Sequence, residues 1–195
     1  MIVSEKNKSF LWLVNKTGSN HAAEVFSKYD FFNLRINNGI KTTSKISANH
    51  DYTIYDGFDD YTFICTARNP FTRILSSYKF NNKNPLEWHP SRFRLFFFER
   101  YGGDNLKRFI YPFRQRTPDY FIRLENLVED YGKIDFIKNS DFYQSGELKK
   151  LCEVKYNSTN DIPNPAEYFT EDIINIILTN GKSYFDLLNY SYPFM

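Results

Sequence analysis

The sequence predicts an α/β protein with a central parallel sheet and helices on both faces. Apolar runs of strand length alternate with segments of helical periodicity, and polar loops containing Gly or Pro follow the strands. At 195 residues, without internal repeats or a low-complexity linker, the chain is expected to form one domain over residues 1–195.

Four segments are expected to be strands. They lie at residues 9–14, 30–36, 60–67 and 119–125. Uninterrupted apolar runs such as SFLWLV and YTFICTA are typical of strands that are covered on both faces of a parallel sheet. The polar stretch 37–53 between the second and third strands is expected to be a loop.

Helices are expected where apolar residues recur every three or four positions. Pro70 can occupy the first position of one helix, and Thr170 can serve as the N-cap of the last. The expected helices lie at residues 19–29, 71–80, 91–113 (one or two helices), 125–132 and 169–190. Within the third, FRLFFFERYG has two interpretations: a buried helix, or an aromatic platform for stacking sugars.

Composition excludes several classes of protein. Lys and Arg number 25 and Asp and Glu 23, so the net charge of +2 does not favour a nucleic-acid partner. The sequence has no membrane-spanning apolar segment and no signal-peptide pattern, which predicts a cytoplasmic protein without a membrane partner. Cys65 and Cys152 lack metal-ligand spacing and are expected to be free thiols. The oligomeric state is not predicted.

The stretch NKTGSNH at residues 15–21 follows the first strand and opens a helix. Such a loop directs backbone N–H groups and the positive end of the helix dipole at one point, and Lys16 adds a formal charge there. An ATP-binding P-loop requires G-x-x-x-x-G-K-[ST], whereas here Gly18 follows the lysine and no glycine precedes it. The loop therefore predicts a different phosphate site or, taken alone, a plain strand-to-helix turn.

A second candidate anion site follows the strand at 60–67. Arg68 lies at the strand end, and Ser76 lies eight residues later on the next helix. An arginine fork and a hydroxyl can converge on one phosphate. Ligands of such sheets bind beyond the carboxyl ends of the strands, so the two segments together predict a site for a nucleotide with two separate phosphate groups.

These motifs resemble the sulfotransferases that use 3′-phosphoadenosine 5′-phosphosulfate, in particular the carbohydrate sulfotransferases. FLWLVNKTGSN is similar to their 5′-phosphosulfate loop, and RNPFTRILSSY is similar to their 3′-phosphate segment, R-[DN]-P-x-x-R-x-x-S-x-Y. Downstream, RLENL is similar to an R-x-E-[DN]-L core, in which Arg123 and Glu125 are expected to form a structural pair or to support the nucleotide site. KYNSTND at 155–161 and the C-terminal helix extend the resemblance over residues 9–192.

The resemblance implies a three-layer P-loop-like fold and metal-free transfer of a sulfuryl group. The donor is 3′-phosphoadenosine 5′-phosphosulfate, the product is 3′,5′-bisphosphoadenosine, and the acceptor is a hydroxyl, less often an amine, of a saccharide or another small molecule. Lys16 is implied to stabilise the leaving oxygen. The residues implied to bind the donor are Lys16, Thr17, Gly18, Ser19, Asn20, His21, Arg68 and Ser76.

The resemblance places the general base at His50, 18 residues before Arg68; the alternatives are a surface role for His50 and Glu24 as the base. His21 departs from the family pattern, so it is either an extra cation at the donor phosphate or a side chain packed beside the loop. Two further functions stay open: a nucleotide-binding protein without catalysis, and an ATP-dependent phosphotransferase.

Overall fold

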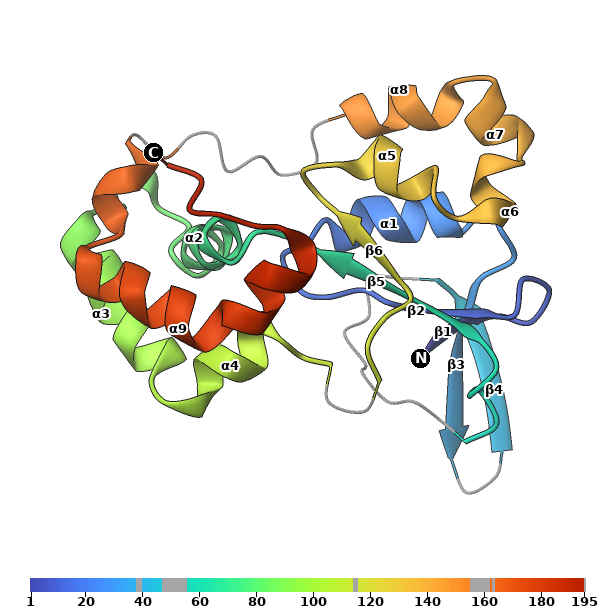
Figure 1. Cartoon of the computed structure of the whole chain (residues 1–195), viewed down its shortest axis with the longest axis horizontal. Coiled ribbons are helices and arrows are strands. Elements are labelled where there is room, and N and C mark those ends of the chain that lie inside the picture. Colours follow the sequence, from blue (N-terminus) through green and yellow to red (C-terminus); the bar gives the residue numbers. More distant parts are fainter. Residues whose placement is uncertain (38–39, 47–55, 114–115, 155–161, 163, 195) are drawn as a thin grey trace. The chain divides into compact units, whose positions relative to one another are not determined.

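The computed structural model describes residues 1–37, 40–46, 56–113, 116–154, 162 and 164–194 (Figure 1). The chain separates into two compact units. The first comprises Met1–Arg68 and Thr117–Tyr156, and the second comprises Asn69–Arg116 and Asn157–Met195. The single domain expected from the sequence stays a prediction.

In its described residues, the first unit contains one six-stranded sheet with the order β4-β3-β1-β2-β5-β6. The strands are β1 (Ile2–Ser4), β2 (Ser9–Trp12), β3 (Phe32–Asn37), β4 (Ile40–Lys45), β5 (Thr62–Ala67) and β6 (Tyr120–Arg123). β2, β5 and β6 run parallel, whereas β1, β3 and β4 pair in antiparallel fashion. The α/β class is confirmed, but the sheet is mixed rather than parallel throughout.

Two expectations for the N-terminal half are wrong. The polar stretch 37–53 was expected to be a loop, but it contains β4, which pairs with β3 from Phe32 opposite Lys45 to Asn37 opposite Ile40. All residues of β4 are exposed, so the strand has no apolar alternation that would reveal it. The strand expected at residues 30–36 is present as β3, but it was expected in a parallel sheet, whereas it lies between β1 and β4 and is antiparallel to both.

The helices of the first unit share one apolar cluster with the sheet. They are α1 (Ser19–Phe26), α5 (Leu127–Tyr131), α6 (Asp135–Lys138), α7 (Asp141–Gln144) and α8 (Glu147–Glu153), which Figure 1 shows on the same side of the sheet. Leu11 and Leu13 share one buried cluster with Phe26. The alternate residue Phe10 points to the other face and stacks on Phe63 at 4.6 Å between ring centroids. Both faces of β2 are therefore buried, as its continuous apolar run predicted.

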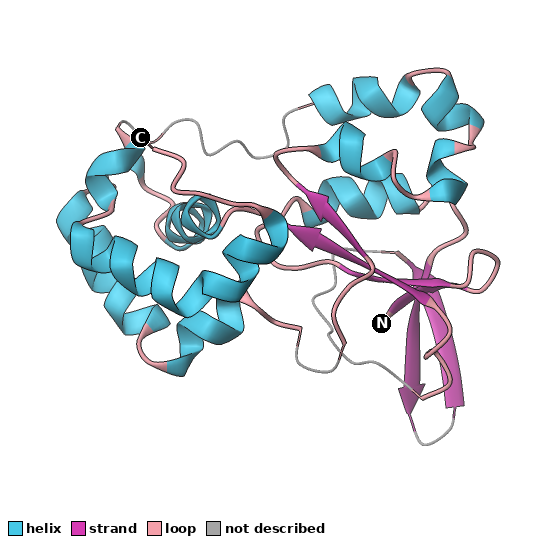
Figure 2. Ribbon diagram, in the orientation of Figure 1, coloured by secondary structure: helices cyan, strands magenta, loops and turns pink. Residues whose placement is uncertain are grey.

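The second unit is helical in its described residues, as Figure 2 shows. It comprises α2 (Pro70–Asn81), the 3₁₀ turns η1 (Pro85–Glu87) and η2 (Pro165–Tyr168), α3 (Pro90–Tyr101), α4 (Asp104–Ile110) and α9 (Glu171–Leu188). Pro70 opens α2 as expected, and the Asn69 side chain caps it by accepting from the Phe71 N–H at 3.1 Å. In Figure 1, α2 is seen end-on beside α3, α4 and α9, and aromatic rings such as Phe71 and Phe169, 5.3 Å apart, fill the core.

None of the helices in the described ranges has both the length and the apolar composition needed to cross a membrane.

Candidate functional site

The loop between β2 and α1 has a backbone conformation suited to anions. Lys16 and Gly18 both have positive φ angles, 64° and 80°, on either side of Thr17. Successive residues whose backbone alternates between right-handed and left-handed conformations direct their N–H groups to the same side of the chain and form an anion-binding concavity. Gly18 is also the N-cap of α1, and among the described residues no side chain caps this eight-residue helix. The backbone N–H groups of the first helical turn, at the positive end of the helix dipole, therefore lie next to the loop.

Two hydroxyl groups brace this loop against the strands. Thr17 Oγ1 and Ser19 Oγ both donate to the Val14 carbonyl, at 2.6 and 2.7 Å. The Val14 N–H donates to Thr66 Oγ1 of β5 at 2.8 Å, and the Thr66 and Thr17 hydroxyls lie 2.6 Å apart. Thr17 and Ser19 are buried, whereas Lys16 is half-buried and Asn20 is exposed. The loop conformation is therefore set by contacts inside the first unit.

Gly18 also brings the loop close to the end of β6. A Cβ atom on Gly18 would lie 2.8 Å from Leu124 Cδ1. A residue with a side chain would meet both this contact and the left-handed backbone, so glycine is required here for two independent reasons.

The two anion-binding segments predicted from the sequence meet at one edge of the sheet. β2 and β5 are adjacent and parallel, so the residues that follow them leave the sheet side by side. Arg68 is only 9% exposed, and its Nη1 donates to the Lys16 carbonyl at 3.4 Å. The structure thus brings the guanidinium group of one predicted segment against the backbone of the other.

The remaining residues of the RNPFTRILSSY segment belong to the second unit. Ser76 is half-buried on α2. Arg73 is buried with its guanidinium 3.9 Å from the centroid of the Phe109 ring, and Tyr78 is fully buried. Arg73 and Tyr78 therefore have structural contacts that account for their place in the motif.

His21 packs beside the loop. Its side chain is 2% exposed, and Nδ1 lies 3.3 Å from the Tyr131 hydroxyl of α5. Burial lowers the pKa of His21 below its ordinary value of 6.5, although the negative charge of Glu24 acts in the opposite direction. The neutral imidazole consequently links the first turn of α1 to α5. Glu24, the alternative base, is exposed on α1.

His50, the predicted general base, lies outside the described residues, as does the segment 155–161. The structure therefore places the predicted loop residues 16–21 and Arg68 in the first unit and Ser76 in the second.

Sequence reasoning missed the buried partner of Arg123. The structure pairs Arg123 with Asp130 of α5: Nε donates to Oδ2 at 2.8 Å and Nη2 to Oδ1 at 2.7 Å. Asp130 is 2% exposed. Burial alone would raise its pKa, but hydrogen bonds from Arg123 and Lys133 outweigh that effect and lower it. The segment 125–130 contains three acidic residues, and no local pattern in the sequence indicates that Asp130 is the one that is buried.

Comparisons of the chain with protein-family models, with curated proteins and with solved structures yielded no match.

Proposed function

We propose that this protein is a sulfotransferase that moves a sulfuryl group from 3′-phosphoadenosine 5′-phosphosulfate to a hydroxyl, less often an amine, of a saccharide or another small acceptor. The observation that carries the proposal is the contact between the Arg68 guanidinium and the Lys16 carbonyl. It joins two segments that each suit a phosphate, at adjacent ends of the parallel strands β2 and β5. A donor with phosphates at both its 3′ and 5′ positions matches such a pair.

The residues present fit the 5′ end of this donor. The positive φ angles of Lys16 and Gly18 and the start of α1 supply backbone N–H groups, and Lys16 supplies a cation. Because the Thr17 and Ser19 hydroxyls hold the Val14 carbonyl, we assign anion binding mainly to the backbone, Lys16 and Asn20. The three-layer P-loop-like arrangement belongs to the same proposal.

The bound donor would supply the activated sulfuryl group, and the protein would supply charge and orientation. Lys16 neutralises the negative charge that develops on the departing phosphate oxygen. Arg68 holds the 3′-phosphate, with Ser76 as its proposed partner. His50 accepts the proton of the acceptor hydroxyl, with Glu24 as the alternative base. The acceptor is a saccharide or glycan in this proposal.

Thermal-shift and calorimetric titrations with 3′,5′-bisphosphoadenosine, ADP and ATP with magnesium test the donor site. We expect selective stabilisation by the bisphosphate. Arg68→Ala should weaken its binding by roughly tenfold to a hundredfold, because a charged hydrogen bond contributes about 1.5–3 kcal/mol. Arg35→Ala is the matched control, since Arg35 is an exposed arginine on β3.

Arg68 is nearly buried, so circular dichroism must first show that Arg68→Ala is folded. Arg68→Lys, which keeps the charge and loses the fork, provides a second variant and should give an intermediate affinity. The proposal is refuted if the bisphosphate gives no stabilisation or if ATP with magnesium is preferred. The second outcome would favour a phosphotransferase instead.

An assay of sulfuryl transfer from labelled 3′-phosphoadenosine 5′-phosphosulfate to a mixture of desulfated oligosaccharides distinguishes an enzyme from a protein that only binds the nucleotide. Lys16→Ala should reduce transfer by about a hundredfold or more, since one charge-stabilising group at the reacting oxygen contributes about that much. Lys41→Ala, a change of an exposed lysine on β4, should leave transfer unchanged. Tight bisphosphate binding without transfer would indicate a nucleotide-binding protein without catalysis.

A further inference from the structure

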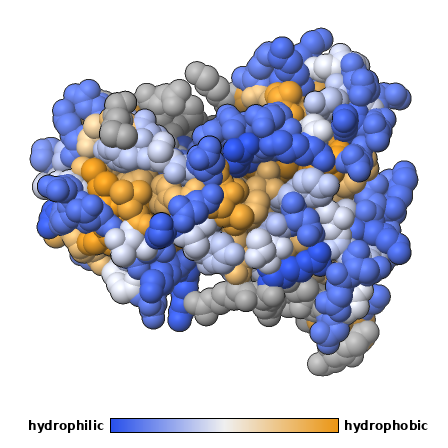
Figure 3. Space-filling view, viewed as in Figure 1, coloured by the Kyte–Doolittle hydropathy of each residue, from blue (hydrophilic) through white to orange (hydrophobic). Residues whose placement is uncertain are grey.

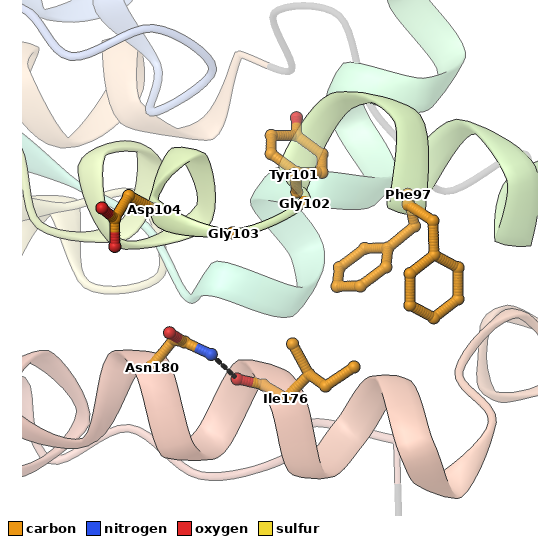
Figure 4. A pocket seen from close by; sticks show the side chains of 8 residues that line it. Phe97, Tyr101, Gly102, Gly103, Asp104, Ile176 and Asn180 are labelled. Carbon is orange, nitrogen blue, oxygen red and sulfur yellow. Dashed lines mark hydrogen bonds between the residues drawn. The ribbon is translucent and has the colours of Figure 1, made fainter.

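The second unit has a cavity of about 300 Å³ between α3, the start of α4 and α9 (Figure 4). This volume is at the lower end of the range of ligand sites and suffices for one sugar ring. Its side chains come from three helices: Phe97, Phe98 and Tyr101 from α3, Asp104 from α4, and Ile176 and Asn180 from α9. None of them belongs to the site proposed above.

One wall of the cavity is aromatic and preformed. Phe97 and Tyr101 are buried, with ring centroids 5.9 Å apart, and Phe97 meets Phe98 edge-to-face at 5.4 Å. Phe98 is 40% exposed, so this ring reaches the surface. Figure 4 shows Ile176 pointing from α9 towards these rings, and Figure 3 shows hydrophobic residues at the surface where α9 lies in Figure 1. The C–H face of a pyranose ring can pack on the exposed Phe98 ring, which the buried Phe97 ring supports from behind.

Polar groups lie at the other end of the cavity. The Asn180 Nδ2 donates to the Ile176 carbonyl at 2.8 Å, which fixes the amide and leaves its second N–H and its Oδ1 for a ligand. Within the described ranges, the exposed Asp104 carboxylate makes no hydrogen bond or ion pair. Figure 4 shows Asp104 and Asn180 across from each other. A carboxylate and an amide offer both acceptors and a donor, which is what neighbouring hydroxyl groups require.

The link between α3 and α4 keeps this end open. Gly103 has a φ of +59°, and a Cβ atom there would meet nothing within 4 Å. Gly102 approaches the Phe98 carbonyl so closely that a Cβ would lie 2.9 Å from it. The two glycines turn the chain tightly and leave no side chain between the aromatic wall and Asp104.

The surrounding charges disfavour an anionic ligand. The Arg94 guanidinium lies 4.9 Å from the centroid of the Phe98 ring and pairs with Asp172 at 2.7 Å. The Arg94–Asp172 pair carries no net charge, so the Asp104 carboxylate dominates the field at the polar end and would repel an anionic ligand.

We propose that this cavity is a binding site for a neutral saccharide ring, with the Phe98 ring under its C–H face and with Asp104 and Asn180 bound to its hydroxyl groups. The site does not depend on the sulfotransferase proposal, because sugar binding alone defines it. If both proposals hold, the cavity anchors part of a glycan on the second unit.

The test is a titration of the full chain with glucose, galactose, mannose and N-acetylglucosamine, followed by amide chemical shifts and saturation-transfer NMR. Choline and glucuronate serve as cationic and anionic comparison ligands. We expect at least one neutral sugar to bind and to shift the amides of Gly102, Gly103 and Asn180. Asp104→Ala and Asn180→Ala should each weaken binding at least about tenfold.

Asp186→Asn is the matched control, because it changes an exposed carboxylate elsewhere on α9 and should leave sugar binding unchanged. Binding of 3′,5′-bisphosphoadenosine, measured on the same variants, separates this proposal from the proposed function. The saccharide site is overturned if no neutral sugar binds, if Asp104→Ala binds as tightly as the original protein, or if choline or glucuronate binds in preference.

Discussion

Replacing Gly18 with alanine should destabilise the first unit through two separable effects. The φ of +80° is left-handed, where an L side chain costs about 1–2 kcal/mol. The new Cβ would lie 2.8 Å from Leu124 Cδ1, and overpacking of this kind costs about 1–3 kcal/mol. We therefore expect Gly18→Ala to lower the free energy of unfolding by about 2–5 kcal/mol.

Gly146→Ala isolates the backbone effect. Gly146 is also a helix N-cap with a similar φ of +77°, but a Cβ there would meet nothing within 4 Å. This variant should lose only about 1–2 kcal/mol. Urea unfolding followed by circular dichroism at 222 nm measures both variants under identical conditions.

Leu124→Ala provides the second comparison, because it removes the side chain that the new Cβ would strike. In the double variant the two losses should therefore be less than additive. Equal losses for Gly18→Ala and Gly146→Ala, or strictly additive losses in the double variant, would refute the reasoning. The same substitution should also weaken binding of 3′,5′-bisphosphoadenosine, because Gly18 closes the proposed phosphate loop.

Four further predictions concern buried or half-buried groups of the first unit. Asp130→Asn should lower the free energy of unfolding by about 3–5 kcal/mol, because it leaves the Arg123 guanidinium without its buried counter-ion; urea unfolding measures the loss, and a change below 1 kcal/mol would contradict it. Because the pKa of His21 is lowered in the folded protein, the unfolded chain binds this proton first as pH falls. The free energy of unfolding should therefore decrease as pH drops below about 6.5. The urea midpoint of His21→Gln, measured between pH 8 and pH 5, should lack the part of the pH dependence that comes from His21. Asp130, whose pKa is also lowered, should add a second loss as pH falls below its ordinary value of 3.8. Burial raises the pKa of the Cys152 thiol from 9.0 to about 11, so the native protein should react with iodoacetamide at pH 7.5 about a hundredfold more slowly than the urea-unfolded chain; equal rates would refute this.

Elements marked by local patterns were predicted well. Strands at 9–14 and 60–67 and the helix opened by Pro70 correspond to β2, β5 and α2. Their signals are continuous apolar runs and a proline at a helix start, and both depend on a few consecutive residues. β4 escaped prediction because its exposed residues IKTTSK carry no such signal, and its strand conformation comes from pairing with β3.

The candidate site shows the same division. The order Lys16, Gly18, helix is readable in the sequence, and the parallel neighbours β2 and β5 made the approach of Arg68 predictable. The direction in which each side chain points could not be predicted from the sequence. His21 turns to Tyr131, and the Thr17 hydroxyl turns to the Val14 carbonyl.

The sequence by itself therefore determined the α/β class, the strand–loop–helix unit around Lys16 and the meeting of that loop with Arg68, because these follow from periodicity and chain order. Only the tertiary structure decided the mixed sheet, the Asp130 partner of Arg123 and the burial of His21. The physical reason is that strand pairing and buried polar contacts depend on residues far apart in the chain, such as His21 and Tyr131, whose approach no local pattern encodes.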